Sequence, residues 1–235
     1  MFPSSPQWEA ADMEPRYARN IPALTEAECA LLRTKKVAVI GCGGLGGHLI
    51  ELLARIGIGS IRAVDGDVFE PTNLNRQLLS EVSLLGSSKA VAAAQRVTQV
   101  NPDVSVEAKS CFLTEENALS LIRDCDAVLD GLDNIESRKI LSSACRDAGI
   151  PYIFGAISGW VAQAAISMPQ DRLVDTLYPE GTVIHDKSVL SFTPALCASL
   201  QASLCTKLLV GRSVAPGTLY YFDLLNQEFE TIPMA

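Results

Sequence analysis

Short aliphatic runs alternate with amphipathic segments along most of this chain. The runs typical of strands lie at 37–41, 60–65, 104–110, 126–130 and 151–156. Hydrophobic residues recur at helical spacing at 45–57, 88–100, 115–123 and 136–148. Strands that alternate with helices predict an α/β fold, with a mainly parallel sheet that helices cover on both faces.

The alternation weakens beyond Gly155. The segments predicted there are strands at 151–157 and 161–168, a polar loop at 169–187, a helix at 194–210 and strands at 218–223 and 228–232. Ser158 and Gly159, between the first two strands, are typical of a hairpin turn. We expect the later strands to extend the same sheet as an antiparallel C-terminal extension.

A run of glycines follows the first predicted strand. Its members are Gly41, Gly43, Gly44 and Gly46. A helical pattern comes next, and the second predicted strand ends on Asp65. This is the order of a Rossmann-like βαβ unit that binds a nucleotide, because N–H groups at the helix start face phosphate and the acid accepts a ribose hydroxyl.

A polar cluster that a plain dinucleotide site does not need lies just beyond Asp65. It comprises Asn73, Asn75, Arg76 and Gln77. Arg76 is the most informative, because a planar guanidinium binds phosphate oxygens through paired hydrogen bonds and so suits a triphosphate. Lys89, near the start of the next helix, could face the same nucleotide or be a solvated surface charge. Asp67 could support the site or only form part of a turn.

The fourth predicted strand ends in Asp130-Gly131-Leu132-Asp133-Asn134. Acids at the carboxyl end of a parallel strand lie in the ligand crevice of an open α/β sheet. One of them could hold Mg²⁺, which keeps several waters and needs only one or two carboxylates. Asp133 could otherwise cap the helix predicted from Glu136, and both roles could hold.

Composition bounds these possibilities. With 235 residues, 48% of them hydrophobic, the chain suits one large α/β domain. A net charge of −8 argues against broad binding to nucleic acid or to an anionic membrane, and no apolar run is long enough to span a bilayer. Seven cysteines, an odd number without any C-x-x-C pair, are typical of reduced thiols in a cytoplasmic protein and give no support to a zinc site.

We expect a single domain over 1–235. Its parts are an N-terminal helical arm at 1–33, a nucleotide-binding core at 34–168, a crossover-like loop at 169–193 and a C-terminal helix with strands at 194–235. Within the arm, Thr25 and Glu28 are spaced as a capping box, which predicts the start of a helix.

Taken together, the motifs resemble the ThiF/MoeB/HesA family, the bacterial relatives of ubiquitin-activating enzymes. The resemblance extends from RYARN at 16–20 to the terminal strands, and its other anchors are GCGGLG at 41–46, VDGDVFEPTNLNRQ at 64–77, SKA at 88–90, VNP at 100–102 and DGLDN at 130–134. It implies an ATP-dependent adenylyltransferase. Such an enzyme activates the C-terminal carboxylate of a small ubiquitin-like sulfur-carrier protein, ending in Gly-Gly, for thiamine, molybdopterin, tungstopterin or amino-acid sulfur pathways.

The resemblance also implies roles for single residues. Gly41, Gly43, Gly44 and Gly46 shape the nucleotide loop, Asp65 binds the ribose, Asn73, Arg76 and Lys89 hold the triphosphate, Asp133 binds magnesium, and Asp67 and Leu132 complete the site. Arg19 in RYARN matches an arginine that reaches the phosphates from the partner subunit. The site would then depend on a homodimer.

The chain departs from the family in its cysteines. Many members carry two C-x-x-C pairs that bind zinc, and some carry a cysteine in the crossover loop, but residues 169–191 contain none. Cys197 and Cys205 lie on a predicted buried helix, so core packing is the expected role. The chemistry is then expected to end at the acyl-adenylate, with sulfur supplied by a separate donor protein.

Three other readings stay open at this stage. An NAD-dependent oxidoreductase explains Gly41 to Asp65 but leaves Arg76 and Lys89 without a role. An adenylating enzyme for a tRNA base or a peptide carboxylate is a second reading, and the tRNA version conflicts with the acidic net charge. A non-catalytic subunit that scaffolds a carrier is the third.

Overall fold

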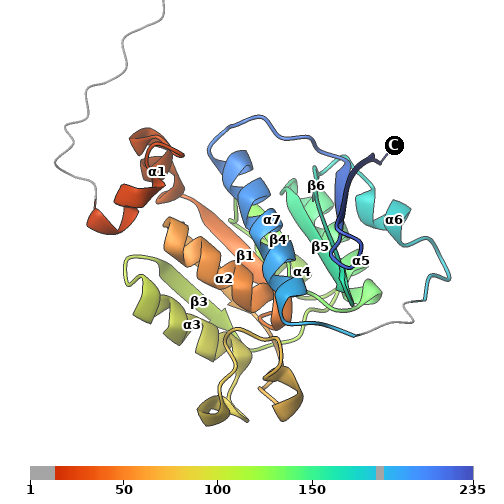
Figure 1. Cartoon of the computed structure of the whole chain (residues 1–235), viewed down its shortest axis with the longest axis horizontal. Helices are drawn as coiled ribbons and strands as arrows, with labels where there is room; N and C mark the ends of the chain where they lie inside the picture. Colours follow the sequence, from red (N-terminus) through yellow and green to blue (C-terminus); the bar gives the residue numbers. More distant parts are fainter. Residues whose placement is uncertain (1–13, 184–187, 235) are drawn as a thin grey trace, which may run out of the picture.

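A single eight-stranded sheet organises the part of the chain that the computed structural model describes, residues 14–183 and 188–234 (Figure 1). The strands are β1 (Lys36–Ile40), β2 (Ser60–Val64), β3 (Ser105–Lys109), β4 (Ala127–Asp130), β5 (Tyr152–Ser158), β6 (Val161–Ser167), β7 (Thr218–Asp223) and β8 (Glu228–Pro233). Their order is β3-β2-β1-β4-β5-β6-β7-β8. Strands β1 to β5 run parallel to one another, and the pairs β5–β6, β6–β7 and β7–β8 are antiparallel, which confirms the α/β fold with an antiparallel extension.

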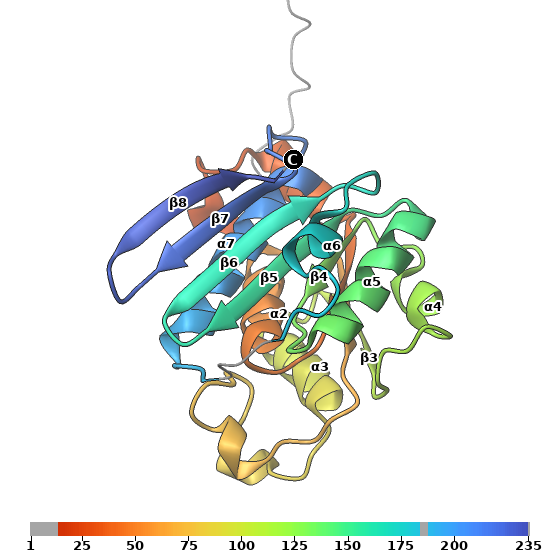
Figure 2. The same cartoon turned by 90° about the vertical axis from the view of Figure 1, so that its right-hand side faces the viewer.

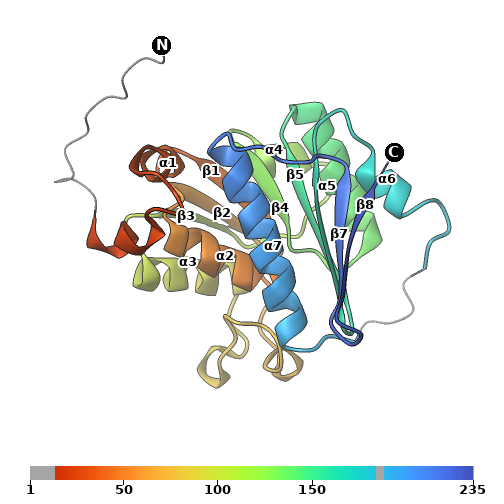
Figure 3. The ribbon, with the colours of Figure 1, turned by 45° about the horizontal axis from the view of Figure 1, so that its top comes forward.

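Helices cover both faces of this sheet (Figures 2 and 3). They are α1 (Glu26–Leu32), α2 (Gly44–Ile56), α3 (Lys89–Val100), α4 (Ala118–Ile122), α5 (Ile135–Ala148), α6 (Leu173–Leu177) and α7 (Phe192–Leu209). Apolar side chains of α2, α3 and α7 join one core cluster, and those of α4, α5 and α6 join the other. Successive β1 residues alternate between the clusters, with Val37 and Val39 in one and Ala38 and Ile40 in the other, because strand side chains point to opposite faces in turn.

The predicted elements differ from the observed ones mainly in the loops. The segment predicted as a polar loop at 169–187 contains the short helix α6, and residues 184–187 of it lie outside the described part. The helix predicted at 115–123 is only α4, since Asn117 accepts the Thr114 N–H at 2.8 Å and holds the preceding residues in a turn. The hairpin after β5 turns at Gly159 and Trp160, one residue later than predicted.

The N-terminal arm is described from Glu14 onward. It begins with a short 3₁₀ helix over Pro15–Asn20, and α1 starts at the predicted capping box, where Thr25 and Glu28 exchange hydrogen bonds. The arm lies against the carboxyl end of α2, because the Tyr17 ring packs on Gly57. No described helix is both long and apolar enough to cross a bilayer.

Three glycines allow two loops to touch backbone to backbone. Gly41 follows β1 with a φ of +92°, a conformation that favours glycine. A Cβ atom at Gly131, which follows β4, would lie 2.5 Å from the carbonyl oxygen of Gly41, and one at Gly46 would overlap that oxygen. The turn before α2 and the loop before α5 therefore meet at a point where no side chain fits.

Gly46→Ala should lower the free energy of unfolding by about 2 kcal/mol, as overpacking commonly does. Helix propensity alone gives the opposite sign, because alanine stabilises a helix interior by about 1 kcal/mol over glycine. Gly44→Ala in the same helix is the matched control, since its Cβ would meet only the Arg76 side chain, at 3.6 Å. Urea unfolding measures both variants, and a Gly46→Ala protein as stable as wild type contradicts the close approach.

Candidate functional site

A cleft of about 430 Å³ opens at the carboxyl ends of the central parallel strands. Its wall includes nine residues that the sequence predicts for the site, namely Gly41, Gly43, Gly44, Asp65, Asp67, Arg76, Lys89, Leu132 and Asp133. They come from the turn after β1, the loop after β2, the start of α3 and the loop after β4. Segments separated by up to about ninety residues thus converge, because the carboxyl ends of parallel strands all lie at the same end of the sheet.

The amino end of α2 forms the floor of the cleft. Gly43 is the N-cap and Gly44 the first helical residue, and no side chain caps this end. The first N–H groups of a helix have no partner within the helix, and the helix dipole adds partial positive charge there. This end of α2 is therefore suited to bind phosphate.

Asp65, the first residue after β2, orients the glycine turn. Its Oδ2 atom accepts the Cys42 N–H at 2.7 Å, and its Oδ1 atom accepts the Asp67 N–H at 2.8 Å. Burial raises the pKa of the Asp65 carboxyl, while these two N–H groups act to lower it. A carboxylate has about four acceptor sites, so Asp65 can still accept a ribose hydroxyl.

Lys89 is held at the cleft by an acid. It is the first residue of α3, its side chain is only 9% exposed, and Nζ lies 3.2 Å from Asp67 Oδ2. A buried position and an ion pair exclude the solvated surface role for Lys89. Asp67 is correspondingly more than a turn residue.

Arg76 has no such acid. Its Nη1 atom donates to the Thr72 carbonyl and to Asn75 Oδ1, each at 2.9 Å. Within residues 14–183 and 188–234, no carboxylate lies within ion-pair distance of Arg76. Neutral oxygens thus fix the guanidinium at the cleft without neutralising its charge, which leaves that charge to attract an anion.

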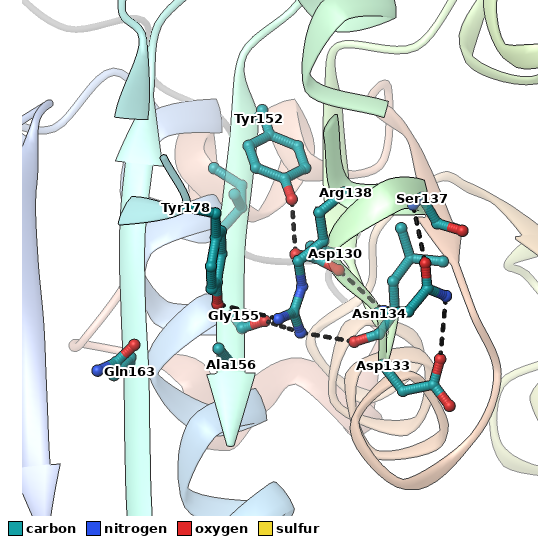
Figure 4. Close-up of polar contacts among 12 residues, drawn as sticks. Asp130, Asp133, Asn134, Ser137, Arg138, Tyr152, Gly155, Ala156, Gln163 and Tyr178 are labelled. Atoms are coloured by element: carbon teal, nitrogen blue, oxygen red, sulfur yellow. Dashed lines mark hydrogen bonds and ion pairs between the residues drawn. The ribbon is translucent and has the colours of Figure 1, made fainter. Parts of the chain in front are cut away.

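The two acids at the end of β4 have different environments (Figure 4). Asp130 is fully buried, and its Oδ2 atom accepts Arg138 Nε at 3.1 Å and the Tyr152 hydroxyl at 2.6 Å. Burial raises the pKa of the Asp130 carboxyl, and Arg138 opposes that rise. Asp130 is therefore occupied in a buried ion pair and is not free to bind a metal.

Asp133 is exposed in the cleft, where its Oδ1 atom accepts Asn134 Nδ2 at 3.2 Å. Asn134, not Asp133, caps α5, because its Oδ1 atom accepts the Ser137 N–H at 2.9 Å. The capping alternative for Asp133 is therefore wrong. Its free carboxylate fits the sparse protein ligation of Mg²⁺, which takes its other ligands from substrate phosphates and water.

Three predicted residues do not line the cleft. Gly46 lies behind the floor, where it permits the contact with Gly41. Asn73 is buried, and its Oδ1 atom accepts the Glu70 N–H at 2.9 Å, so it shapes the loop that carries Arg76. Arg19 is exposed on the N-terminal arm, near the opposite end of α2.

The structure shows contacts that the sequence did not predict for three other cleft residues, of which Gln77 belongs to the polar cluster beyond Asp65. Phe112 is 63% exposed and its ring lies over Gly66. Gln77 is buried beside Gly43, and its Oε1 atom has no hydrogen-bond partner among the described residues. Arg138 joins Asp130 to the carbonyls of Leu132 and Gly155 and to the Tyr178 hydroxyl. The only feature of the sequence that could have indicated a role for Arg138 is its position one turn after Asn134, the residue that caps α5.

Two of the cysteines lie in the core on α7, away from the cleft. Cys197 and Cys205 are fully buried on α7, which confirms their predicted packing role. Burial raises the pKa of each thiol to about 12, so both are protonated near neutral pH. In the described part of the chain, no three His, Cys, Asp or Glu side chains converge as a metal cage.

Relatives of known name match nearly the whole chain. The SAMP-activating enzyme E1 of Haloferax volcanii is 36% identical over 228 residues, which are 93% of this chain and 84% of the relative. The sulfur carrier protein adenylyltransferase of Thermus thermophilus is 32% identical, over 96% of this chain and 89% of its own length. The adenylyltransferase and sulfurtransferase MOCS3 of Xenopus laevis is 33% identical, and the match spans 92% of this chain but only 50% of that protein.

Solved structures show the same fold at low identity. Escherichia coli MccB in complex with ATP has a TM-score of 0.82 at 21% identity, over 96% of this chain and 72% of that one. PaaA has a TM-score of 0.82 at 20% identity, over 98% of this chain and 77% of that one. The family model described as the ThiF family matches residues 17–235. The chain belongs to the ThiF family.

Proposed function

We propose that this chain is an ATP-dependent adenylyltransferase that activates the C-terminal carboxylate of a small ubiquitin-like sulfur-carrier protein. One observation carries the proposal. Arg76, Lys89 and Asp133 come from three separate segments and line one cleft, whose floor is the uncapped amino end of α2. The relatives named for the activation of SAMP and of sulfur carriers support the choice of substrate.

The cleft offers a place for each part of ATP. The amino end of α2 and the guanidinium of Arg76 suit the phosphates, and Asp65 suits the ribose. Apolar wall residues suit the base, and they are Ile40, Val64, Phe112, Leu113 and Leu132. The cleft volume of about 430 Å³ is in the ordinary range for a small-molecule site.

The reaction needs positive charge more than a nucleophile from the protein. A carboxylate oxygen of the carrier attacks the α-phosphorus, a new carboxyl–phosphate bond forms, and the bond to the β-phosphate bridging oxygen breaks to release pyrophosphate. Attacking and attacked groups are both anionic, so fixed cations near the phosphates lower the barrier by electrostatic stabilisation. Arg76 and Lys89 supply those cations in this proposal.

Magnesium would neutralise part of the charge on the phosphates and on the departing pyrophosphate. Asp133 would hold it, because this carboxylate is exposed in the cleft and pairs with no cation among the described residues. We expect no zinc, since the sequence has no C-x-x-C pair.

The full proposal places the whole chain, 1–235, in one adenylation domain of a cytoplasmic homodimer. Arg19 supports the dimer, because it lies at the far end of α2 from its own cleft and so suits the cleft of a second copy. Seven cysteines without a disulfide support a reducing compartment. A carrier that ends in Gly-Gly and a separate sulfur donor protein complete the proposed partners.

The reaction is tested by exchange of labelled pyrophosphate into ATP in the presence of Mg²⁺ and candidate carriers. We expect exchange that depends on the carrier and is lost when its final Gly-Gly is deleted. Arg76→Ala should reduce the exchange rate by about 10²–10³-fold, as the loss of one transition-state donor does elsewhere. Arg76→Lys should restore only part of it, because lysine cannot form paired bonds.

Arg33→Ala is the matched control for Arg76→Ala, because Arg33 is an exposed arginine outside the cleft. It should keep the wild-type rate. Undiminished exchange in Arg76→Ala contradicts the assignment. NAD binding without exchange would favour the oxidoreductase, and exchange driven by a short peptide or a tRNA would favour the other adenylating reading.

Asp133→Asn should raise the Mg²⁺ concentration for half-maximal exchange by about tenfold or more, because Mg²⁺ keeps so few protein ligands in such sites. Titration of the exchange rate with MgCl₂ measures this. Asp147→Asn, at an exposed acid on α5, is the control and should leave the titration unchanged. An identical titration for Asp133→Asn and wild type argues against the metal role.

The shared cleft is tested by mixing two inactive variants, Arg19→Ala and Arg76→Ala. Random pairing makes half of the dimers mixed, and each mixed dimer has one cleft with both arginines intact, so exchange should recover to about a quarter of the wild-type rate. Co-expression of the two variants and assay of the purified mixture provides the measurement. No recovery above the separate variants would contradict a trans role for Arg19.

A further inference from the structure

We propose that Tyr17 and Asn101 are positioning residues that hold Arg19 ready for the cleft of a second copy of this chain. The proposal rests on the trans role of Arg19 in the proposed function. It assigns a task to a buried polar contact between the N-terminal arm and the ends of α2 and α3, away from the cleft.

Arg19 cannot serve its own cleft from where it lies. The 3₁₀ helix Pro15–Asn20 packs at the carboxyl end of α2, where the Tyr17 ring lies on Gly57. The cleft is at the amino end of the same helix, at Gly44. A helix of 13 residues is roughly 20 Å long, so the arm and the cleft lie at opposite ends of α2.

The arm is fastened to the core by Tyr17. Its side chain is only 3% exposed, and its hydroxyl accepts Asn101 Nδ2 at 2.7 Å. The ring fits because residue 57 is glycine, since a Cβ there would lie 2.5 Å from a Tyr17 ring carbon. Asn101 is itself 1% exposed, and Nδ2 also donates to the Ala54 carbonyl at 2.8 Å, which fixes the amide to the last turn of α2.

Neighbouring contacts complete the anchor. Arg16 donates to Asn101 Oδ1 and lies 3.6 Å from Asp103. On the other side of Arg19, Arg212 donates to the Ala23 carbonyl at 2.7 Å and pairs with Glu28 at 2.6 Å. The arm is therefore held at both ends of the stretch that carries Arg19.

Arg19 itself is exposed between these two anchors, and it makes no ion pair with any described residue. Its charge is neither neutralised nor buried, while its backbone is fixed. A fixed backbone matters because ordering one residue costs on the order of a tenfold factor in an equilibrium constant. An arginine on a free arm would meet that cost at every turnover, and the anchor removes it in advance.

Tyr17→Ala should release the arm and lower the exchange rate by about tenfold, and Tyr17→Phe, which keeps the ring and loses only the hydroxyl, should lose less. An effect on rate alone does not separate positioning from general damage. Mixing with other variants does, because an arm defect acts on the cleft of the partner, whereas a defect in the α2–α3 core acts on its own cleft.

Co-expressed with Arg76→Ala, Tyr17→Ala should recover to about a quarter of the wild-type rate, because each mixed dimer has one intact cleft with an intact arm. Co-expressed with Arg19→Ala, it should not recover, since both defects are in arms. Arg33→Ala, a neighbouring exposed cation outside the anchor, is the control and should keep full exchange. Should Tyr17→Ala fail to fold in thermal melts, Tyr17→Phe enters the same mixing test.

Full activity of Tyr17→Ala overturns the inference. A second result also overturns it: Arg76→Ala restores exchange when mixed with Arg19→Ala but not when mixed with Tyr17→Ala. Tyr17 would then act on the cleft of its own subunit. If Arg76→Ala rescues neither, the shared cleft fails and this inference fails with it. If wild type shows no exchange with any carrier, the proposed reaction itself is wrong.

Discussion

The cleft depends on a contact in which two backbone segments meet without side chains between them. Gly41 and Gly131 close the turns after β1 and β4, and Gly46 leaves room for the Gly41 carbonyl. Because these atoms touch, the amino end of α2 lies at the same level as the loop that carries Asp133. A methyl group at either of two of these positions would push the phosphate-facing N–H groups away from the proposed metal ligand.

Charge is distributed around this contact in a graded way. Asp130 forms an ion pair with Arg138 in the core, and Lys89 forms one with Asp67 at the cleft wall. Arg76 donates only to neutral oxygens among the described residues, so its charge is not neutralised. A buried ion pair contributes little net stability, but removal of one partner is strongly destabilising because it leaves a buried charge unpaired. Arg138 therefore acts as a brace for the loop after β4, and the unpaired groups Arg76 and Asp133 remain for a ligand.

The N-terminal arm adds a second fixed charge, Arg19, near the carboxyl end of α2. Tyr17, Asn101 and Gly57 hold it against α2, so that the position of Arg19 follows the core of its own subunit. In the proposed dimer, each cleft would then be completed by a rigid part of its neighbour. Dimer formation would then be a condition for activity.

The order of elements was readable from the sequence, because strand and helix periodicities are local and the glycine run follows a strand directly. The turns were less so. Asn117 shortened α4, and Asn134 rather than Asp133 capped α5, since each outcome depends on which side-chain oxygen reaches a particular N–H group. The family motifs identified the residue types of the site, and those motifs cover the chain from 16 onward.

By itself, the sequence determined the α/β class, because strand and helix patterns alternate along the chain. It also determined the nucleotide loop and the presence of Arg76, Lys89 and Asp133, because each is encoded in a short contiguous motif. Only the tertiary structure decided which charged side chains form ion pairs within the protein and which remain available to a ligand. Asp130 and Asp133 are three residues apart and look alike in sequence, yet one is buried under Arg138 and Tyr152 and the other faces the cleft. That difference arises from contacts between segments distant in the chain, which no local pattern records.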